Sequence, residues 1–553
     1  DLHSFPTRRS SDLSFQVKIK IIAPMQIAWI VLFTLISNTV AKAQEWMGVE
    51  MPKTEIRAVW LTTVKSLDWP RTKALDARSV EKQKQELCTI LDKLQRANIN
   101  TIILQTRVRG TMIYPSKIEP WDDCLTGTHC KSPGYDPLAF AVEQCHKRGM
   151  ELHAWLVTIP LGELKKQQAC GKQSVMKRHP ELCKIVDNDV FMLPSAKGTA
   201  DYIASLCREI INNYDVDGIS LDYIRYPEST YGFKDGSTTA QQKRDNITRI
   251  VRRVHDVVKP LKPWVKLSSS PVGKFKDLSR YKSGGWNAYS AVCQDAQGWL
   301  RDNLQDILFP MMYLRGNHFY PFLFDWAENS YGHPVCPGLG IYFLDPSEGK
   351  WVLNDIRAQM HTVRNSEIGG LAMFRSNFFT RNVKGLYTTA CTEFFAYPAL
   401  QPRMTWCTDT VAPQQPTSLR LDESVLSWNA CAPTGESSYI YYNVYGSNVH
   451  PVDVHKAENL LQARVMGTKF DLGMMAGKKR YFAVTACDRF GNESEALQEE
   501  HKIISLPDMI NAWNPTSRLG VNGTRIDDRM QLLKQSKSLK GKDSKGKRSR
   551  KRR

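Results

Sequence analysis

Eight short apolar segments, bounded by Gly, Pro or Asn, recur along the first three quarters of this chain and predict β-strands. They cover residues 55–63, 101–110, 151–159, 216–227, 265–273, 306–313, 335–344 and 369–379. Amphipathic segments with helical periodicity lie between them, as in residues 247–258, where apolar residues recur at i, i+3, i+4 and i+7.

Strands that alternate with helices indicate a parallel sheet. Eight such units predict an α/β fold of the (β/α)8 TIM type, whose usual size is roughly 200 to over 400 residues. A doubly wound open sheet is the alternative. It is less favoured because no Gly-rich phosphate-binding loop follows the first strand.

The chain divides into a barrel and a smaller C-terminal part. We assign residues 52–405 to the barrel, 406–415 to a linker and 416–505 to a small all-β sandwich of the fibronectin type III kind. The sandwich is indicated by short alternating strands, by Trp428, and by the run from Tyr481 that leads into Asp-Arg-Phe-Gly-Asn.

The first 43 residues have the pattern of an export signal. Residues 1–13 resemble a non-native leader, and 14–43 combine lysines, an apolar run at 27–41 and the small-x-small sequence Ala41-Lys42-Ala43. The run is shorter than the ~20 residues of a membrane span. We expect an exported protein of the periplasm, cell surface or medium, with no membrane span in the mature chain.

The formal net charge of +19 is concentrated at the C-terminal end. Residues 531–553 hold eleven Lys/Arg and one Asp without an apolar period, so we expect residues 506–553 to form a disordered, solvated basic tail. The remainder lacks the alternation of aromatic and basic residues that nucleic-acid platforms use, and we predict no nucleic-acid partner.

Thirteen cysteines are scattered along the chain without a C-x-x-C pair, so we predict no metal site and no cofactor. Cys124 with Cys130, and Cys170 with Cys183, are close enough in sequence to close small disulfide loops, which an exported protein permits. For most of the others, the favoured interpretation is a small buried hydrophobic residue.

Polar and aromatic side chains cluster where the predicted strands end. The active site of a TIM-type barrel lies at the carboxyl ends of its strands, so these side chains are expected on one face. The candidates for substrate binding are Gln105, Arg107, Trp155, Tyr223, Arg225, Tyr313, Asn317, His318 and Arg375, and Arg109 follows the same strand as Arg107.

Carboxylates, aromatic rings and Arg or Asn donors on one face suit a sugar polymer. Glycoside cleavage normally uses two carboxyl groups, and the candidates are Asp222, Asp345 and Glu228, with Glu119 as a further one. Each has a structural alternative. Asp222 can hold the loop by pairing with Arg225, Asp345-Pro346 can start a turn, and Glu228 can face solvent.

Four stretches resemble the bacterial family-10-like glycosyl hydrolases: EIRAVWLTTV, YPSKIEPW…GYDPLAFAVEQCHKRGMELHAW, VDGISLDYIRYPE and LFPMMYLRGNHFYPF…PGLGIYFLDP. The resemblance covers roughly residues 52–405, and some such proteins carry a trailing fibronectin-like module. It implies an exported barrel glycosidase that acts on a polysaccharide or on the glycan of peptidoglycan.

Two departures bear on that implication. Many relatives have Asp-Asp where this chain has Asp222-Tyr223, and many have Asn-Pro-Tyr-Arg where this chain reads Val-Thr-Ile-Pro at 157–160. The resemblance and the carboxylates at the strand ends still make a glycoside hydrolase the main hypothesis. The alternatives are a non-catalytic glycan-binding barrel or a surface scaffold protein.

Overall fold

The computed structural model describes residues 51–228, 232–236, 238–279, 281, 285–436 and 439–498. The leader, the signal peptide and the basic tail expected from the sequence lie outside these residues. Within them, no helix has the length and hydropathy that crossing a bilayer requires.

All eight predicted strands are confirmed, although each is shorter than its apolar segment. They are β1 (Ile56–Leu61), β2 (Thr101–Arg107), β3 (Glu151–Val157), β7 (Gly218–Asp222), β8 (Lys266–Ser269), β9 (Ile307–Leu308), β10 (Gly338–Leu339) and β11 (Gly370–Met373). They form one parallel sheet in the order β10-β11-β1-β2-β3-β7-β8-β9.

The sheet curls until its two edges meet. Backbone hydrogen bonds join them: Leu308 N donates to Pro334 O at 3.2 Å, Cys336 N to Leu308 O at 2.8 Å, and Gly338 N to Pro310 O at 2.7 Å. This closed sequential order fits a TIM-type barrel. A doubly wound sheet has an open edge and a reversal of strand order instead.

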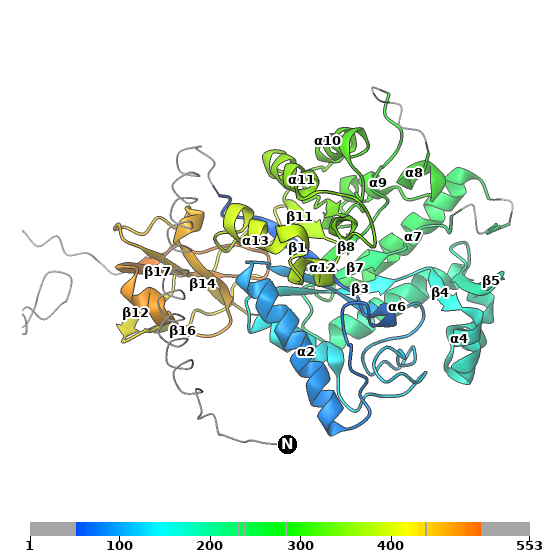
Figure 1. The fold of residues 1–553 in the computed structure, drawn as a ribbon, viewed down its shortest axis with the longest axis horizontal. Coiled ribbons are helices and arrows are strands. Elements are labelled where there is room, and N and C mark those ends of the chain that lie inside the picture. The colour runs from blue at the N-terminus through cyan, green and yellow to red at the C-terminus, as the bar shows by residue number, and fades with distance from the viewer. Residues whose placement is uncertain are drawn as a thin grey trace, which may run out of the picture.

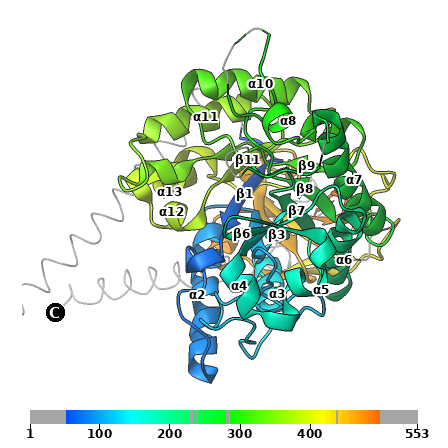
Figure 2. The same cartoon turned by 90° about the vertical axis from the view of Figure 1, so that its right-hand side faces the viewer.

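Helices surround the strands, which occupy the centre of the end-on view (Figure 2). The longer ones are α2 (Ala77–Arg96), α3 (Pro137–His146), α6 (Lys197–Asn213), α7 (Ala240–Val258), α10 (Tyr320–Glu328) and α11 (Leu353–Asn365). The shorter ones are α4 (Leu164–Ala169), α5 (Val175–Arg178), α8 (Ala288–Ala291), α9 (Ala296–Arg301), α12 (Ser376–Thr380) and α13 (Leu386–Thr389).

Local sequence explains where the helices begin. Asp76 and Thr239 form capping boxes with Ser79 and Gln242 at the starts of α2 and α7, which satisfies backbone N–H groups that a helix leaves free. The apolar stripe predicted on α7 is buried against the barrel, as expected for an amphipathic helix.

The sequence analysis missed one insertion. After β3 the chain forms β4 (Pro160–Glu163), β5 (Cys183–Val186) and β6 (Asp189–Met192), an antiparallel sheet in the order β4-β6-β5. Asp187-Asn188 joins β5 to β6 as a two-residue turn. This insertion stands over the carboxyl ends of the barrel strands and forms one wall of the site described below.

The C-terminal part contains two antiparallel sheets, β12-β13-β16 and β15-β14-β17-β18. Their strands are β12 (Thr417–Asp422), β13 (Val425–Asn429), β14 (Tyr441–Ser447), β15 (Leu460–Val465), β16 (Lys469–Asp471), β17 (Tyr481–Cys487) and β18 (Leu497–Gln498). Trp428 and Tyr442 lie in the apolar cluster that these strands share. Their classification as fibronectin type III stays a prediction. We call residues 416–498 the β module.

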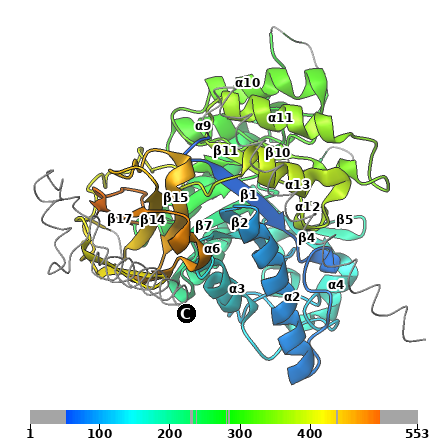
Figure 3. The same ribbon diagram turned by 60° about the vertical axis from the view of Figure 1, so that its left-hand side comes forward.

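The β module docks on the amino-terminal end of the barrel. Arg464 of β15 contacts Asp217 Oδ1 at 2.7 Å and Glu151 Oε1 at 3.2 Å, and Arg489 also reaches Asp217 at 3.2 Å. Glu151 opens β3 and Asp217 directly precedes β7, so both mark strand starts. Figures 1 and 3 show β14 and β17 on one side of the barrel, and Figure 1 shows β4 and α4 on the opposite side.

Candidate active site

Asp222, the last residue of β7, lies at the carboxyl end of the barrel and is 4% exposed. Both carboxylate oxygens accept a hydrogen bond. Trp155 Nε1 donates to Oδ2 at 3.0 Å, and Tyr223 N donates to Oδ1 at 2.7 Å. Trp155, the fifth residue of β3, is thus a neighbour of the carboxyl group from the next strand of the barrel.

Burial raises the pKa of the Asp222 carboxyl above its usual value. Arg225, the two hydrogen bonds and Arg109 act in the opposite direction, but they do not outweigh the loss of hydration. A carboxyl group that is costly to ionise at the end of a barrel strand is typical of a functional group.

Tyr313, which follows β9, is the second aromatic neighbour. Its pKa is raised well above the usual value, first by burial and then by the nearby Asp222 carboxylate. Its ring lies 5.2 Å from Phe374 and 5.7 Å from Tyr342. Aromatic side chains therefore stand on the same face of the barrel as Asp222, which is the arrangement the sequence predicted for Trp155 and Tyr313.

Arg225 has a guanidinium group held between two rings. Its Cζ lies 4.6 Å from the ring centroid of Tyr223 and 5.1 Å from that of Trp286. The side chain is 5% exposed, and its Nη1 has no hydrogen-bond partner. Its other contact is Nη2 to Glu228 Oε1 at 3.5 Å. A buried guanidinium with a free donor is poised to bind an additional acceptor.

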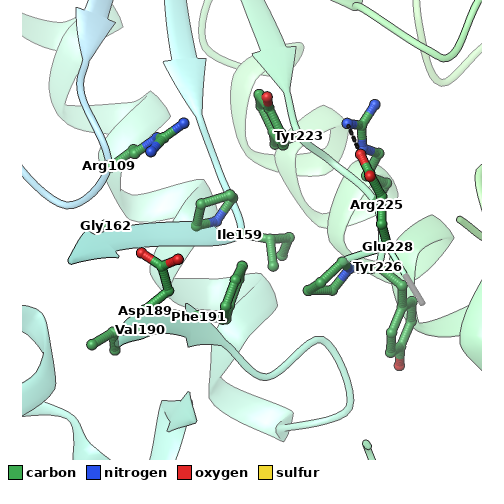
Figure 4. Close-up of a pocket in the computed structure, with 12 residues that line it drawn as sticks. Arg109, Ile159, Gly162, Asp189, Val190, Phe191, Tyr223, Arg225, Tyr226 and Glu228 are labelled. Carbon is green, nitrogen blue, oxygen red and sulfur yellow. Dashed lines mark hydrogen bonds and ion pairs between the residues drawn. The ribbon is translucent and has the colours of Figure 1, made fainter. Parts of the chain in front are cut away.

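A pocket opens beside these groups (Figure 4). Tyr223, Arg225 and Glu228 line it from the loop after β7, Arg109 lines it from the loop after β2, and Asp189 lines it from β6. Asp222 directly precedes Tyr223 in the chain and is not itself a lining residue. The pocket therefore combines two arginines with two carboxylates, and Asp222, whose pKa is raised, is the chain neighbour of the lining residue Tyr223.

Two lining residues have strained backbones. Arg109 has φ of 56° and Tyr223 has φ of 51°, both in the left-handed region that side chains disfavour. Such strain persists where surrounding contacts enforce it, and it is concentrated at functional sites. Here it turns the chain sharply at the ends of β2 and β7, where the pocket lies.

A wider cleft of about 640 Å³ adjoins the pocket and shares Arg109 and Gly162 with it. Its cationic lining residues are Lys65, Lys73, Arg109, Lys165 and Lys166, and its acidic ones are Asp122, Asp123 and Glu163. A polar groove that continues from a pocket on the carboxyl face has room for a chain of sugar units.

Three predicted substrate contacts have partners within the protein, and their role toward a substrate stays a prediction. Arg107 is fully buried, donates to both oxygens of Glu119 at 2.8 and 2.6 Å, and bonds to Thr158 O at 2.8 Å. Gln105 accepts from Thr63 N at 3.0 Å and so holds the loop after β1. In these positions Gln105 and Arg107 make contacts within the protein, and Glu119 is paired with Arg107.

Arg375 is the third of these residues. It is 8% exposed, and its Nη1 lies 2.7 Å from Asp68 Oδ1 and 3.0 Å from Leu67 O. This pair fastens the loop after β1 to the end of β11. The sequence pattern could not separate these residues from true ligands because inward and outward positions of a fully buried parallel strand look alike.

Asp345 forms a turn. Its Oδ1 accepts from Ser347 N at 3.1 Å and Ser347 Oγ at 2.8 Å, and Oδ2 pairs with Arg381 at 3.3 Å. The hydrogen bonds from Ser347 and the charge of Arg381 lower the pKa of Asp345. It does not line the pocket. This placement matches the turn alternative.

Asn317 and His318 are exposed in the short 3-10 helix Gly316–His318 and do not line the pocket. His318 Nδ1 lies 3.1 Å from Lys274 Nζ. Among the predicted residues, the structure thus groups Asp222, Tyr223, Arg225, Glu228, Trp155 and Tyr313, and it places Asp345, Asn317 and His318 elsewhere.

Sequence reasoning missed Asp189 and Trp286. Asp189 belongs to the unpredicted insertion, and its only sequence signal is the Asp187-Asn188 turn between two short apolar runs. Trp286 is 46% exposed in a loop, and nothing in its local pattern distinguishes it. Over the residues that the structure describes, no three His, Cys, Asp or Glu side chains group closely enough to hold a metal ion.

Comparison with known proteins supports a glycosyl hydrolase-like family. Residues 55–329 match the family described as Glycosyl hydrolase-like 10. Glycosyl hydrolase YngK of Bacillus subtilis (strain 168) is 28% identical over 518 residues, covering 85% of this chain and 98% of that protein. Glycosyl hydrolase DigH of Escherichia coli (strain K12) is 29% identical over 372 residues, covering 59% of this chain and 84% of that protein.

Among solved structures, the glycoside hydrolase domain of PgaB (BpsB) from Bordetella bronchiseptica aligns with 61% of this chain and 98% of its own, at 12% identity and a TM-score of 0.43. The family match and the two relatives are what support a glycoside hydrolase-like function.

Proposed function

We propose that this chain is an exported glycoside hydrolase that cleaves glycosidic bonds of a polysaccharide or of the glycan strand of peptidoglycan. The observation that carries the proposal is the buried Asp222 carboxyl at the carboxyl end of β7, next to an Arg225 guanidinium whose Nη1 has no partner. Burial raises the pKa of Asp222, Arg225 Nη1 lacks an acceptor, and an oxygen of a bound sugar would supply that acceptor.

The two carboxyl groups that we assign to the chemistry are Asp222 and Glu228. Because burial raises its pKa, Asp222 suits the general acid, which must hold a proton until the leaving group takes it. Glu228 has a side chain that is 40% exposed and lines the pocket, so it suits the second carboxyl group, which activates water or attacks the sugar.

The neighbouring side chains have positioning roles in this proposal. Trp155 holds Oδ2 of Asp222 through its indole N–H, and Tyr223 and Trp286 present rings on which a sugar can stack. Arg225 would donate Nη1 to a sugar oxygen, and Arg109 faces it across the pocket (Figure 4).

The test is release of reducing ends by the purified chain from Gln44 onward. The glycan panel contains peptide-free peptidoglycan, xylan and host-type glycans. Asp222→Asn should lower turnover of the accepted substrate about 10²- to 10⁴-fold, the usual contribution of general acid–base catalysis. Asp345→Asn is the matched control and should retain activity, because its carboxylate holds a turn.

Equal activity of wild type and Asp222→Asn would refute the assignment of Asp222. Saturable binding of one glycan without any release would instead establish the glycan-binding barrel.

A further inference from the structure

Two cysteine thiols meet beside the cleft. Cys130 lies in the loop after β2 and is half-buried, and Cys170 caps the carboxyl end of α4 and is buried. Neither cysteine is bonded to a partner in the structure, and their side chains lie within interaction distance of each other. They come from segments that are far apart in sequence but form adjoining walls of the cleft.

Independent contacts hold these segments together. Lys166 lies one helical turn before Cys170, and its Nζ contacts Asp122 at 2.7 Å and Asp123 at 3.0 Å. His129 Nδ1, next to Cys130, lies 2.9 Å from the same Asp123. The thiol contact is therefore part of a network that fixes α4 against the loop after β2.

The two thiols form a pair and not part of a larger cluster. Across the described ranges, no third Cys, His, Asp or Glu joins them in a group that could bind a metal. Two close thiols without further ligands are the arrangement from which a disulfide forms.

We propose that Cys130 and Cys170 form a disulfide bond that ties the loop after β2 to α4 and so fixes the wall of the cleft. The proposal is independent of the hydrolase activity. It replaces both pairings that sequence proximity suggested, because Cys124 with Cys130 and Cys170 with Cys183 would each consume one of these cysteines.

The oxidant is a small or protein disulfide, RS–SR, of the kind that exported proteins meet. The more accessible Cys130 attacks one sulfur of RS–SR as its thiolate and releases the first RSH. The Cys170 thiolate then attacks Cys130 Sγ in the mixed disulfide and releases the second RSH. Two thiols are oxidised, one disulfide is reduced, and the two cysteine protons leave with the two RSH molecules.

The order of attack follows from burial. Burial and the adjacent Cys130 thiol raise the pKa of Cys170 to about 12. Since the thiolate is the nucleophile, Cys170 suits the second, intramolecular step better than the first.

The test is peptide mapping of the full folded chain after incubation with oxidised glutathione and alkylation of the remaining thiols. Trypsin places Cys124 and Cys130 in peptide 118–131, Cys170 in 167–172 and Cys183 in 179–184. We expect a linked species of 118–131 and 167–172, two hydrogens lighter than the sum and abolished by reduction. Fragmentation should locate the link at Cys130.

Two variants make the result decisive. Cys170→Ser should abolish the linked species, and Cys183→Ser should leave it intact. Peptide 118–131 closed on itself, a link between 167–172 and 179–184, or complete alkylation of Cys130 and Cys170 would each overturn the proposal.

Discussion

Asp217 and Asp222 lie at the two ends of the same strand, β7, and they differ in how their charges are compensated. Both are buried. Asp217, at the amino-terminal end, is paired with Arg464, Arg489 and His146 at 2.7, 3.2 and 2.8 Å. Asp222, at the carboxyl end, accepts hydrogen bonds from Trp155 and Tyr223, but no cation lies in direct contact with it among the described residues.

The pKa shifts record the difference. Burial acts to raise the pKa of Asp217, but Arg464, His146 and Arg489 outweigh it and hold the pKa well below the usual value. At Asp222 burial prevails and the pKa is raised. The paired carboxylate of Asp217 therefore stabilises the amino-terminal end of β7. At the carboxyl end, ionisation of Asp222 costs folding free energy, which is common in active sites.

The docked β module is what makes the amino-terminal end so well paired. Arg464 comes from β15 and bridges Glu151 and Asp217, two carboxylates of the barrel. Arg489 adds a second contact to Asp217 and also pairs with Asp215. The module thus forms part of the structure at the amino-terminal end of the barrel, and Figure 1 shows it on the side opposite β4 and α4.

The largest expected change in the free energy of unfolding follows from a substitution at this interface between the β module and the barrel. Arg464→Ala should destabilise the protein by about 3–5 kcal/mol, because removal of one partner leaves buried charges uncompensated. Denaturant unfolding of the full chain measures it. Arg420→Ala, at an exposed position of β12, is the control and should change stability by less than about 0.5 kcal/mol. Equal effects of the two variants would show that the interface network is not stabilising.

Low pH should destabilise the fold at the amino-terminal end of the barrel, where Glu151 lies. Burial acts to raise the pKa of Glu151, but Lys266, His153 and Arg464 outweigh it and lower the pKa from 4.5 to about 2. A depressed carboxyl pKa stabilises the fold above the unfolded-state pKa, and this contribution disappears as the pH falls through the folded-state value.

The melting temperature should therefore fall between pH 4.5 and 2, and the Glu151→Gln variant should show a shallower fall. Glu458→Gln, an exposed substitution in the β module, should follow the wild type. If the melting temperatures of wild type and Glu151→Gln fell equally with pH, the lowered pKa of Glu151 would not be a source of stability.

The smallest expected change in stability follows from substitution of Asp222, at the carboxyl end of β7, and it is an increase. A raised carboxyl pKa means that ionisation costs folding stability as the pH rises through the unfolded and then the folded pKa. Asp222→Asn should therefore stabilise the protein at pH 7, on the order of 1 kcal/mol, while it lowers turnover about 10²- to 10⁴-fold.

The gain should vanish below the pKa of an unfolded Asp, about 3.9. Melting temperatures of wild type and variant across pH 3 to 8 measure it. A destabilised Asp222→Asn at pH 7 would mean that Arg225 needs the carboxylate as its structural partner.

The alternation of strands and helices by itself determined the barrel, its eight strands and the face on which polar groups collect. This is because the apolar period and the breakers are local properties of the chain. It also predicted Asp222, Tyr223, Arg225 and Glu228 as site candidates, because they follow a single strand and stay together in any barrel with that strand.

Only the tertiary structure decided which carboxylates and cations form buried ion pairs and which line the pocket. Arg107 and Arg109 are two residues apart, yet one is buried on Glu119 and the other lines the pocket. Asp189 reaches the site through the inserted sheet, Arg464 reaches the opposite end through the docked module, and Cys130 meets Cys170 across the cleft wall. These contacts join residues distant in sequence, and charge and burial at such points depend on packing that no local pattern records.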